Sequence, residues 1–219
     1  MRDAISINYC MYCQKPNETS PTWKSLLDHR YQTLKCEQCA RKFCRMDETI
    51  DGVFCMFDFN EEMREYFHRL KFMKDVLLVY MFQQEIYDTL KKFQQTYPHH
   101  VITPVPMHEE NKKIRTFAHV DELLRAAGVP FSHALRKITT ETQSKKTRRQ
   151  RLETKKLFET ISDVKYKHFI VFDDIKTTGV TMKLAKEALI EAGAASVELI
   201  AFSGGNSKRP NQTTSFMKK

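Results

Sequence analysis

The sequence of 219 residues has no apolar run long enough to span a membrane. The longest such run, Val76–Phe82, falls far short of the roughly 18 residues that a transmembrane helix needs. The N-terminal segment also lacks the apolar core of a secretory signal peptide, and the chain has no internal repeat. These absences argue against a membrane span, export and a repeat architecture, and we expect a cytoplasmic protein.

Cysteine is also absent from most of the chain, because all six cysteines lie within the first 55 residues. Four of them form two C-x2-C pairs, Cys10 with Cys13 and Cys36 with Cys39. Two sulfurs at this spacing converge on one ion from a tight turn, and two such turns complete the four-thiolate shell that Zn2+ prefers. A disulfide framework is the alternative, but a reducing cytosol disfavours it. The spacing therefore predicts a structural zinc site at these four cysteines.

The other two cysteines, Cys44 and Cys55, leave the ligand set open. Either could replace one of the four or hold a second ion, although aromatic neighbours such as Phe43 and Phe54 favour a core position. We expect residues 1–59 to form a small zinc-ribbon-like module that owes its folding free energy largely to the metal. Its basic and acidic side chains balance, so DNA binding by this module alone is a weak inference.

The formal net charge of +9 is concentrated in one window of the sequence. Residues 136–156 hold nine basic and two acidic side chains, and such a block attracts the phosphates of a nucleic acid or of a small ligand. A solvated loop is the alternative. The window contains none of the aromatic residues on which single-stranded DNA would stack. The candidate phosphate-binding cations are Lys145, Lys146, Arg148, Arg149 and Arg151.

Helix and strand patterns alternate after residue 60. Apolar residues at helical spacing predict helices over 63–71, 79–93, 117–127 and 180–192. Short apolar runs predict buried strands over 101–106, 168–172 and 197–203. The order strand, loop, helix, strand in the last third indicates a right-handed βαβ unit with parallel strands. We therefore expect an α/β domain over 60–204, a parallel sheet with flanking helices, followed by a polar tail over 205–219.

The segment between the strand 168–172 and the helix 180–192 has the composition of a ligand-binding loop. In a parallel α/β sheet, ligands bind at the carboxyl ends of strands, in front of helix N-termini. Gly179 permits a tight turn, and the amides around it can hold a phosphate with help from the helix dipole. The carboxylates of Asp173 and Asp174 suit ribose hydroxyls or hydrated Mg2+. Each residue type is also common in caps and turns, but the combination predicts a ribose-phosphate site.

The stretch Phe172–Thr181, FDDIKTTGVT, resembles the loop that binds phosphoribosyl pyrophosphate (PRPP) in type I phosphoribosyltransferases. Further features occur in the order typical of the ComF family of competence proteins, and this resemblance covers nearly the whole chain. They are the two cysteine pairs, Arg69–Phe72, the Pro104–Pro106 turn, the block from Gln143 to Arg151, and Leu157-Phe158. The chain departs from the family at 115–119, where RTFAH replaces the commoner RGFNQ, and at Lys176, which adds a cation beside the phosphate loop.

The resemblance implies roles for individual residues. Asp173 and Asp174 match the acidic pair that binds the ribose hydroxyls of PRPP, with Mg2+ bridging ribose and pyrophosphate. Lys146 and Arg148 match cations of a flexible hood that would neutralise the departing pyrophosphate, and with the acidic pair they are the expected catalytic residues. The other expected ligand-binding residues are Val105, Pro106, Thr177, Thr178, Gly179, Val180 and Thr181.

By the same resemblance, we expect a protein that binds PRPP or a related phosphoribosyl ligand, carries structural Zn2+, and supports DNA uptake in natural transformation. A transferase of this kind would displace pyrophosphate from the anomeric carbon of PRPP, mainly by positioning the ribose and stabilising the departing charge. The alternative is a non-catalytic module that binds single-stranded DNA or acts as an adaptor on a vestigial PRPP pocket. The family also implies a competence helicase and recombination-loading proteins as partners. A purine-pathway transferase or PRPP-sensing regulator is a third alternative, which the cysteine module disfavours.

Overall fold

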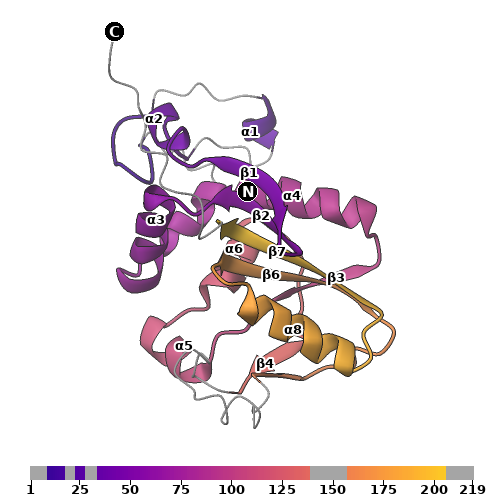
Figure 1. The fold of residues 1–219 in the computed structure, drawn as a ribbon. Helices are drawn as coiled ribbons and strands as arrows, with labels where there is room; N and C mark the ends of the chain where they lie inside the picture. Colours follow the sequence, from indigo (N-terminus) through magenta and orange to yellow (C-terminus); the bar gives the residue numbers. More distant parts are fainter. Residues whose placement is uncertain (1–8, 18–22, 28–33, 139–156, 206–219) are drawn as a thin grey trace.

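A five-stranded sheet in the order β1-β2-β7-β6-β3 forms the centre of the fold (Figure 1). The computed structural model describes residues 9–17, 23–27, 34–138 and 157–205. The sheet is parallel from β2 to β3, and β1 pairs antiparallel with β2 at one edge. The strands are β1 (Arg45–Ile50), β2 (Val53–Asp58), β3 (His100–Pro104), β6 (His168–Lys176) and β7 (Ser196–Gly204). A separate antiparallel pair joins β4 (Leu135–Lys137) to β5 (Phe158–Thr160).

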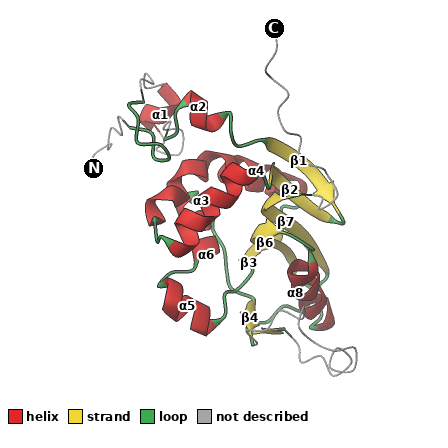
Figure 2. Ribbon diagram, turned by 60° about the vertical axis from the view of Figure 1, so that its left-hand side comes forward, coloured by secondary structure: helices red, strands yellow, loops and turns green. Residues whose placement is uncertain are grey.

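Helices cover both faces of the sheet, as Figure 2 shows with α3, α4 and α6 on one side and α8 on the other. The helices are α1 (Trp23–Leu27), α2 (Glu37–Ala40), α3 (Glu61–Phe72), the 3₁₀ helix η2 (Val76–Phe82), α4 (Gln83–Thr96), α5 (Glu109–Arg115), α6 (His119–Ala126) and α8 (Val180–Glu191). Within the described residues, none of these helices combines the length and apolar character that a bilayer crossing requires.

Two apolar cores, one on each face, follow from the alternation of side chains along β6. Ile170 and Phe172 face the core formed with α3, η2 and α6, whereas Phe169 and Val171 face the core formed with α8. Successive side chains of a strand point to opposite faces, so a strand buried on both sides has a continuous apolar sequence. The same alternation continues into the polar residues at the end of β6.

The expected unit of two parallel strands joined by a helix is confirmed, with β6 and β7 parallel and α8 between them in the chain. β6 is longer than the sequence pattern predicts, because its pairing with β7 continues to Lys176, opposite Gly204. The helix expected over 79–93 is divided into η2 and α4. In η2 the buried side chains recur three positions apart, as in Leu78 and Met81, which is the spacing that a helix of three residues per turn aligns.

Residues 45–58, which the sequence analysis placed in the N-terminal module, belong to the main sheet. The β1–β2 hairpin turns at Asp51 and Gly52, which both have positive φ angles of 51° and 79°. An Asp-Gly pair in this conformation is typical of a type I′ turn, whose twist matches that of the two strands. β2 then pairs with β7, from Phe54 opposite Ile200 to Asp58 opposite Gly204. The sheet is therefore continuous across the boundary expected between residues 59 and 60.

We predict that His100 makes the stability of the sheet sensitive to acid. Burial and the neighbouring His168 lower the pKa of His100, and Ser196 Oγ lies 3.0 Å from His100 Nε2 and 2.8 Å from His168 Nδ1. An unfolded histidine titrates at pH ~6.5. As the pH falls, His100 therefore takes up a proton in the unfolded chain before it does so in the folded protein. Above that pH His100 does not reduce the free energy of unfolding. Below it the free energy of unfolding falls, and it continues to fall until the pH reaches the lower pKa of His100 in the folded state.

Thermal unfolding followed at about pH 7.5 and about pH 5.5, on either side of the ordinary histidine value, tests this prediction. The melting temperature of the wild type should fall more between the two conditions than that of a His100→Gln variant, which keeps a polar side chain but does not titrate. Equal decreases in the two proteins would contradict the prediction.

Candidate functional site

The acidic pair lies at the carboxyl end of β6, with its two side chains on opposite faces of the sheet. Asp173 and Asp174 are each only 8% exposed. Asp174 follows Ile170 and Phe172 on the face covered by α3 and α6, where it contacts both helices. Asp173 lies on the other face, and its Oδ1 accepts a hydrogen bond of 2.9 Å from the amide of Asp174. The two carboxyl groups therefore have different surroundings and do not lie side by side.

Asp174 is bound by two side chains that the sequence analysis did not assign to the site. The ammonium of Lys71, at the end of α3, forms an ion pair with Asp174 Oδ2. His119 Nε2, at the start of α6, lies 2.7 Å from the same oxygen. His119 Nδ1 is buried and has no hydrogen-bond partner among the described residues. Since an ionised carboxylate only accepts hydrogen bonds, the proton between His119 and Asp174 belongs to the histidine.

The two carboxyl groups differ in their tendency to ionise. Burial alone would raise the pKa of Asp174, but the Lys71 ammonium and the contact with His119 hold it well below its usual range. Burial and the adjacent Asp174 carboxylate raise the pKa of Asp173 well above its usual range. Asp174 is therefore the ionised member of the pair, and Asp173 keeps its proton to a higher pH.

Lys137 of β4 and Arg115 of α5 complete the charged surroundings. Burial lowers the pKa of Lys137, the carboxylates of Asp173 and Asp174 oppose this, and the guanidinium of Arg115 adds to it. Each of these effects requires the groups to be near one another. The acidic pair thus has the Lys71 ammonium in contact with Asp174 and interacts electrostatically with Lys137.

The phosphate loop, residues 177–181, leads from β6 into α8. Gly179 occupies the N-cap position of α8 with φ of 78°, a left-handed conformation that glycine adopts without strain. No described side chain caps this N-terminus, and its free amides with the helix dipole form an anion-binding site. Thr177 and Thr178 are exposed and Thr181 is half-buried. Their hydroxyls are therefore accessible to a ligand at this N-terminus.

Lys176, which was expected to add a cation beside the phosphate loop, is paired with a carboxylate. Its Nζ lies 2.9 Å from Asp51 Oδ2 in the β1–β2 turn. The Lys176 side chain is 2% exposed, whereas that of Asp51 is 76% exposed. The stem of Lys176 passes below Gly179, with Cε 3.5 Å from the place that a Cβ would occupy. Lys176 therefore links the phosphate loop to the hairpin.

The other expected ligand residues differ in how they are placed. The Val105 amide donates a hydrogen bond of 2.9 Å to the Phe172 carbonyl, which brings Val105 and Pro106 beside the acidic pair. Val180, at the first position of α8, is 49% exposed. The expected hood cations lie outside the described residues. They are Lys145, Lys146, Arg148, Arg149 and Arg151.

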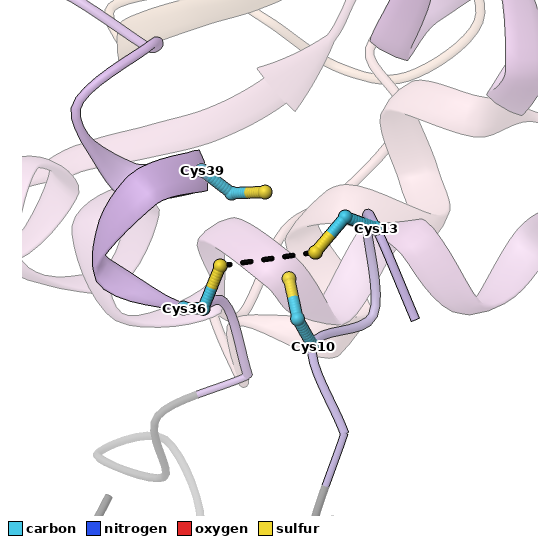
Figure 3. A group of neighbouring side chains, drawn as sticks. All are labelled: Cys10, Cys13, Cys36 and Cys39. Atoms are coloured by element: carbon cyan, nitrogen blue, oxygen red, sulfur yellow. Dashed lines mark hydrogen bonds between the residues drawn. The ribbon is translucent and has the colours of Figure 1, made fainter. Parts of the chain in front are cut away.

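The four paired cysteines come together in one cluster, with their thiols pointing toward one another (Figure 3). All four sulfurs lie within 4.8 Å of each other, and Cys13 Sγ is 3.8 Å from Cys36 Sγ. That separation matches the edge of a tetrahedron of zinc–sulfur bonds of ~2.3 Å. None of the six cysteines is in a disulfide, and Cys44 and Cys55 lie outside the cluster. The donor set is consistent with a structural metal such as zinc.

The thiols of the cluster also differ in acidity. Burial of Cys10 opposes ionisation, but hydrogen bonds from the amides of Cys13, Cys36 and Tyr12 lower its pKa to about 7. Burial and the neighbouring thiols raise the pKa of Cys39. Without a cation the second thiolate is thus disfavoured by the first, whereas a divalent cation at the centre would stabilise both. This chemistry fits a metal site.

The cysteine turn is fastened to α3 through Tyr12, one of the two residues between Cys10 and Cys13. The Tyr12 hydroxyl donates a 3.0 Å hydrogen bond to Glu62 Oε2. Arg69 Nη1 donates a 2.8 Å hydrogen bond to the Tyr12 carbonyl, and its guanidinium lies 5.1 Å from the centre of the Tyr12 ring. The cysteine cluster and the acidic pair are therefore connected by one helix.

Comparisons with known proteins found a matching family model and similar proteins. The family model described as "Phosphoribosyl transferase domain" matches residues 116–218. Competence protein ComFC of Bacillus subtilis is 31% identical over 219 residues, covering 85% of this chain and 90% of that protein. Competence protein ComFC of Streptococcus pneumoniae is 32% identical over 167 residues, covering 76% and 73%. A hypoxanthine-guanine-xanthine phosphoribosyltransferase structure aligns with 60% of this chain and 67% of its own, at 15% identity and a TM-score of 0.36.

The C-terminal half of the chain is therefore a phosphoribosyltransferase domain. The identity and coverage of the two curated relatives show more, because both span most of the chain. The chain belongs to the ComFC family of competence proteins, with a four-cysteine cluster before the phosphoribosyltransferase domain.

We predict that the protein binds one zinc ion per chain and that Cys39→Ser abolishes this binding. Cys39 is 3% exposed and belongs to the cluster, so its loss removes one of four thiolates and with it much of the metal-derived folding free energy. Elemental analysis should show less than about a tenth of the zinc, and thermal unfolding a lower melting temperature. Cys44→Ser, at an exposed cysteine outside the cluster, is the control and should keep its zinc. Full zinc occupancy in Cys39→Ser would contradict the assignment.

Proposed function

We propose that the carboxyl edge of this sheet binds a phosphoribosyl ligand of the PRPP type, and that this binding serves DNA uptake during natural transformation. The observation that carries the proposal is the position of a buried, ionised carboxylate, Asp174, five residues before a glycine-capped helix N-terminus. The carboxylate suits ribose hydroxyls, which donate hydrogen bonds, and the helix N-terminus suits a phosphate. A ribose 5-phosphate group has both. Both relatives named above are competence proteins, and the role in DNA uptake extends that description to this chain.

The residues around Asp174 would prepare the pocket for this ligand. Lys71 and His119 keep Asp174 ionised, so it can accept hydrogen bonds at neutral pH. The phosphate loop would hold the 5-phosphate through backbone amides and the hydroxyls of Thr177, Thr178 and Thr181. Because Lys71 is the cation nearest to the Asp174 carboxylate, a ligand that binds Asp174 would compete with Lys71 for it.

Asp174, the ionised member of the acidic pair, would also offer a carboxylate oxygen of the kind that Mg2+ prefers. Bound there, Mg2+ would supply charge neutralisation for the pyrophosphate of PRPP. Displacement of pyrophosphate would break the bond from the anomeric carbon to oxygen, and the bond to an acceptor would replace it. Because the anomeric carbon becomes oxocarbenium-like, the task of the chain is to position the ribose and balance charge. The hood cations expected at Lys146 and Arg148 would act on the departing pyrophosphate.

We predict that PRPP with Mg2+ binds the wild type and that Asp174→Asn weakens this binding on the order of 100-fold, as for a charge-assisted contact of about 3 kcal/mol. Isothermal titration calorimetry gives the affinity directly. Asp163→Asn is the matched control, because Asp163 has a side chain that is 74% exposed and lies away from the acidic pair. No heat with the intact protein would contradict the proposal.

Asp174→Asn leaves the Lys71 ammonium buried without its partner, which costs about 3–5 kcal/mol of stability. A second variant keeps the test decisive if that protein unfolds. Thr178→Ala changes an exposed hydroxyl of the phosphate loop and should fold normally, yet weaken binding about tenfold for one lost hydrogen bond. Unchanged affinity in both variants would contradict the placement of the ligand. Release of pyrophosphate measured with candidate acceptors then distinguishes a transferase from a binding module.

A further inference from the structure

Lys176, the last residue of β6, carries a buried charge close to the phosphate loop. Its side chain is only 2% exposed, and its Nζ lies 2.9 Å from Asp51 Oδ2 in the β1–β2 turn. Lysine is almost never fully buried unless its charge is paired, and Asp51 is the ion-pair partner that the described residues provide. A lysine ammonium has three N–H donors and no acceptor. The contact with one carboxylate oxygen therefore leaves donors that a second anion could use.

Two close approaches fix the direction of the Lys176 side chain. In the pairing of β6 with β7, Lys176 lies opposite Gly204, and a Cβ at Gly204 would lie 3.2 Å from Lys176 Cβ and 2.5 Å from Cys55 Sγ. Further along the same side chain, Cε lies 3.5 Å from the place that a Cβ of Gly179 would occupy. The stem thus runs from the end of β6 beneath the phosphate loop. The ammonium, one bond beyond Cε, is held near the N-terminus of α8.

The charges of Lys176 and Asp51 do not cancel on the buried side of the pair. The Asp51 side chain is 76% exposed, so water and salt screen its charge, whereas a buried charge is screened much less. The neighbouring Cys55 shows this difference. Burial raises the pKa of the Cys55 thiol to about 11, and Lys176 lowers this pKa by more than Asp51 raises it. A positive field from Lys176 therefore adds to that of the N-terminus of α8, which no described side chain caps.

A purely structural link between the hairpin and the phosphate loop does not require this charge. The hairpin is already fixed by the pairing of β1 with β2 and of β2 with β7. Replacing a buried ion pair by well-packed apolar side chains often leaves stability unchanged or higher. The cation does have a use if a phosphate binds at the N-terminus of α8, because it attracts the anion over a short and poorly screened distance.

We propose that Lys176 is a binding residue for the ligand phosphate at the N-terminus of α8, and that Asp51 sets the strength of this binding by competing for the same ammonium. The proposal rests on the proposed function and extends it, because it adds to the phosphate loop a side-chain cation and the counter-ion that controls it. In the free protein Asp51 pairs with the ammonium. When a phosphate binds, the ammonium has two anionic partners, and its contact with Asp51 weakens. Asp51 precedes the segment matched by the phosphoribosyltransferase model, which begins at residue 116.

Isothermal titration calorimetry with inorganic phosphate and with ribose 5-phosphate tests the role of the cation. Lys176→Met keeps most of the buried stem and removes the charge, so it should weaken the binding of both ligands about tenfold. Lys176→Arg keeps the charge and should retain most of the affinity. Lys186→Met makes the same change of net charge at an exposed position of α8, and this control should bind both ligands as the wild type does.

Asp51→Asn separates competition from a structural role, because the two predict opposite results. Asn adopts the left-handed conformation of this position, with φ of 51°, as readily as Asp does. Without the competing carboxylate, the affinity for both ligands should rise about threefold. If the pair only held the phosphate loop in place, the affinity would fall or stay the same. Combined with Lys176→Met, Asp51→Asn should have no further effect, because Asp51 acts through the ammonium.

Asp163→Asn is the matched control for the carboxylate. Asp163 has a side chain that is 74% exposed and is paired with a lysine, Lys167, as Asp51 is with Lys176. It should bind both ligands as the wild type does. If Lys176→Met does not fold, as judged by its thermal unfolding, the comparison of Asp51→Asn with the wild type decides the proposal alone.

The failure of this proposal differs from the failure of the proposed function. If both ligands bind the wild type and Lys176→Met leaves their affinity unchanged, Lys176 is not a phosphate-binding residue. If Asp51→Asn fails to raise the affinity, Asp51 does not compete for the ammonium. In both cases the ribose-phosphate assignment stands. If inorganic phosphate, ribose 5-phosphate and PRPP all fail to bind the wild type, the proposed function is wrong and the role of Lys176 with it.

Discussion

The ion pair between Lys71 and Asp174 is the contact on which the arrangement of the site depends. Both side chains are largely buried, and a buried charge that loses its partner costs about 3–5 kcal/mol. The pair therefore fixes the C-terminal end of α3 against the carboxyl end of β6. His119 binds the same carboxylate oxygen from the start of α6, so three elements distant in sequence converge on one side chain. Asp173 and the phosphate loop are close to Asp174 in the sequence, so contacts that fix Asp174 also restrict their positions.

The same helix connects the acidic pair to the cysteine cluster. α3 carries Lys71 near its end, and its earlier residues Glu62 and Arg69 bind Tyr12 inside the cysteine turn. Ordering of that turn around a metal would also order α3, and with it the cation that keeps Asp174 ionised. The match to the phosphoribosyltransferase domain begins at residue 116, yet Lys71 precedes it. The candidate site therefore includes a residue outside the matched segment.

Local patterns predicted the parts of this structure that depend on neighbours in sequence. The parallel unit of β6, α8 and β7 follows from two apolar runs around a helix, and the cysteine cluster follows from two C-x2-C pairs. The partners of Asp174 could not be found this way, because Lys71 lies about a hundred residues away and no periodicity records a side-chain pair across that separation. The pairing of β2 with β7 and the contact of Lys176 with Asp51 were missed for the same reason. Long-range pairing depends on the order of strands in the sheet, which local sequence does not encode.

The charges of the site favour a ligand with two chemically different parts. A simple polyanion would be repelled by the carboxylate of Asp174, and a neutral sugar would gain little from the uncapped N-terminus of α8 or from the cations of α5. A sugar phosphate satisfies both halves, since its hydroxyls donate to the carboxylate while its phosphate accepts from the amides. The ligand that we propose for this arrangement is therefore anionic at its phosphate and donates hydrogen bonds from its ribose hydroxyls to the buried carboxylate of Asp174.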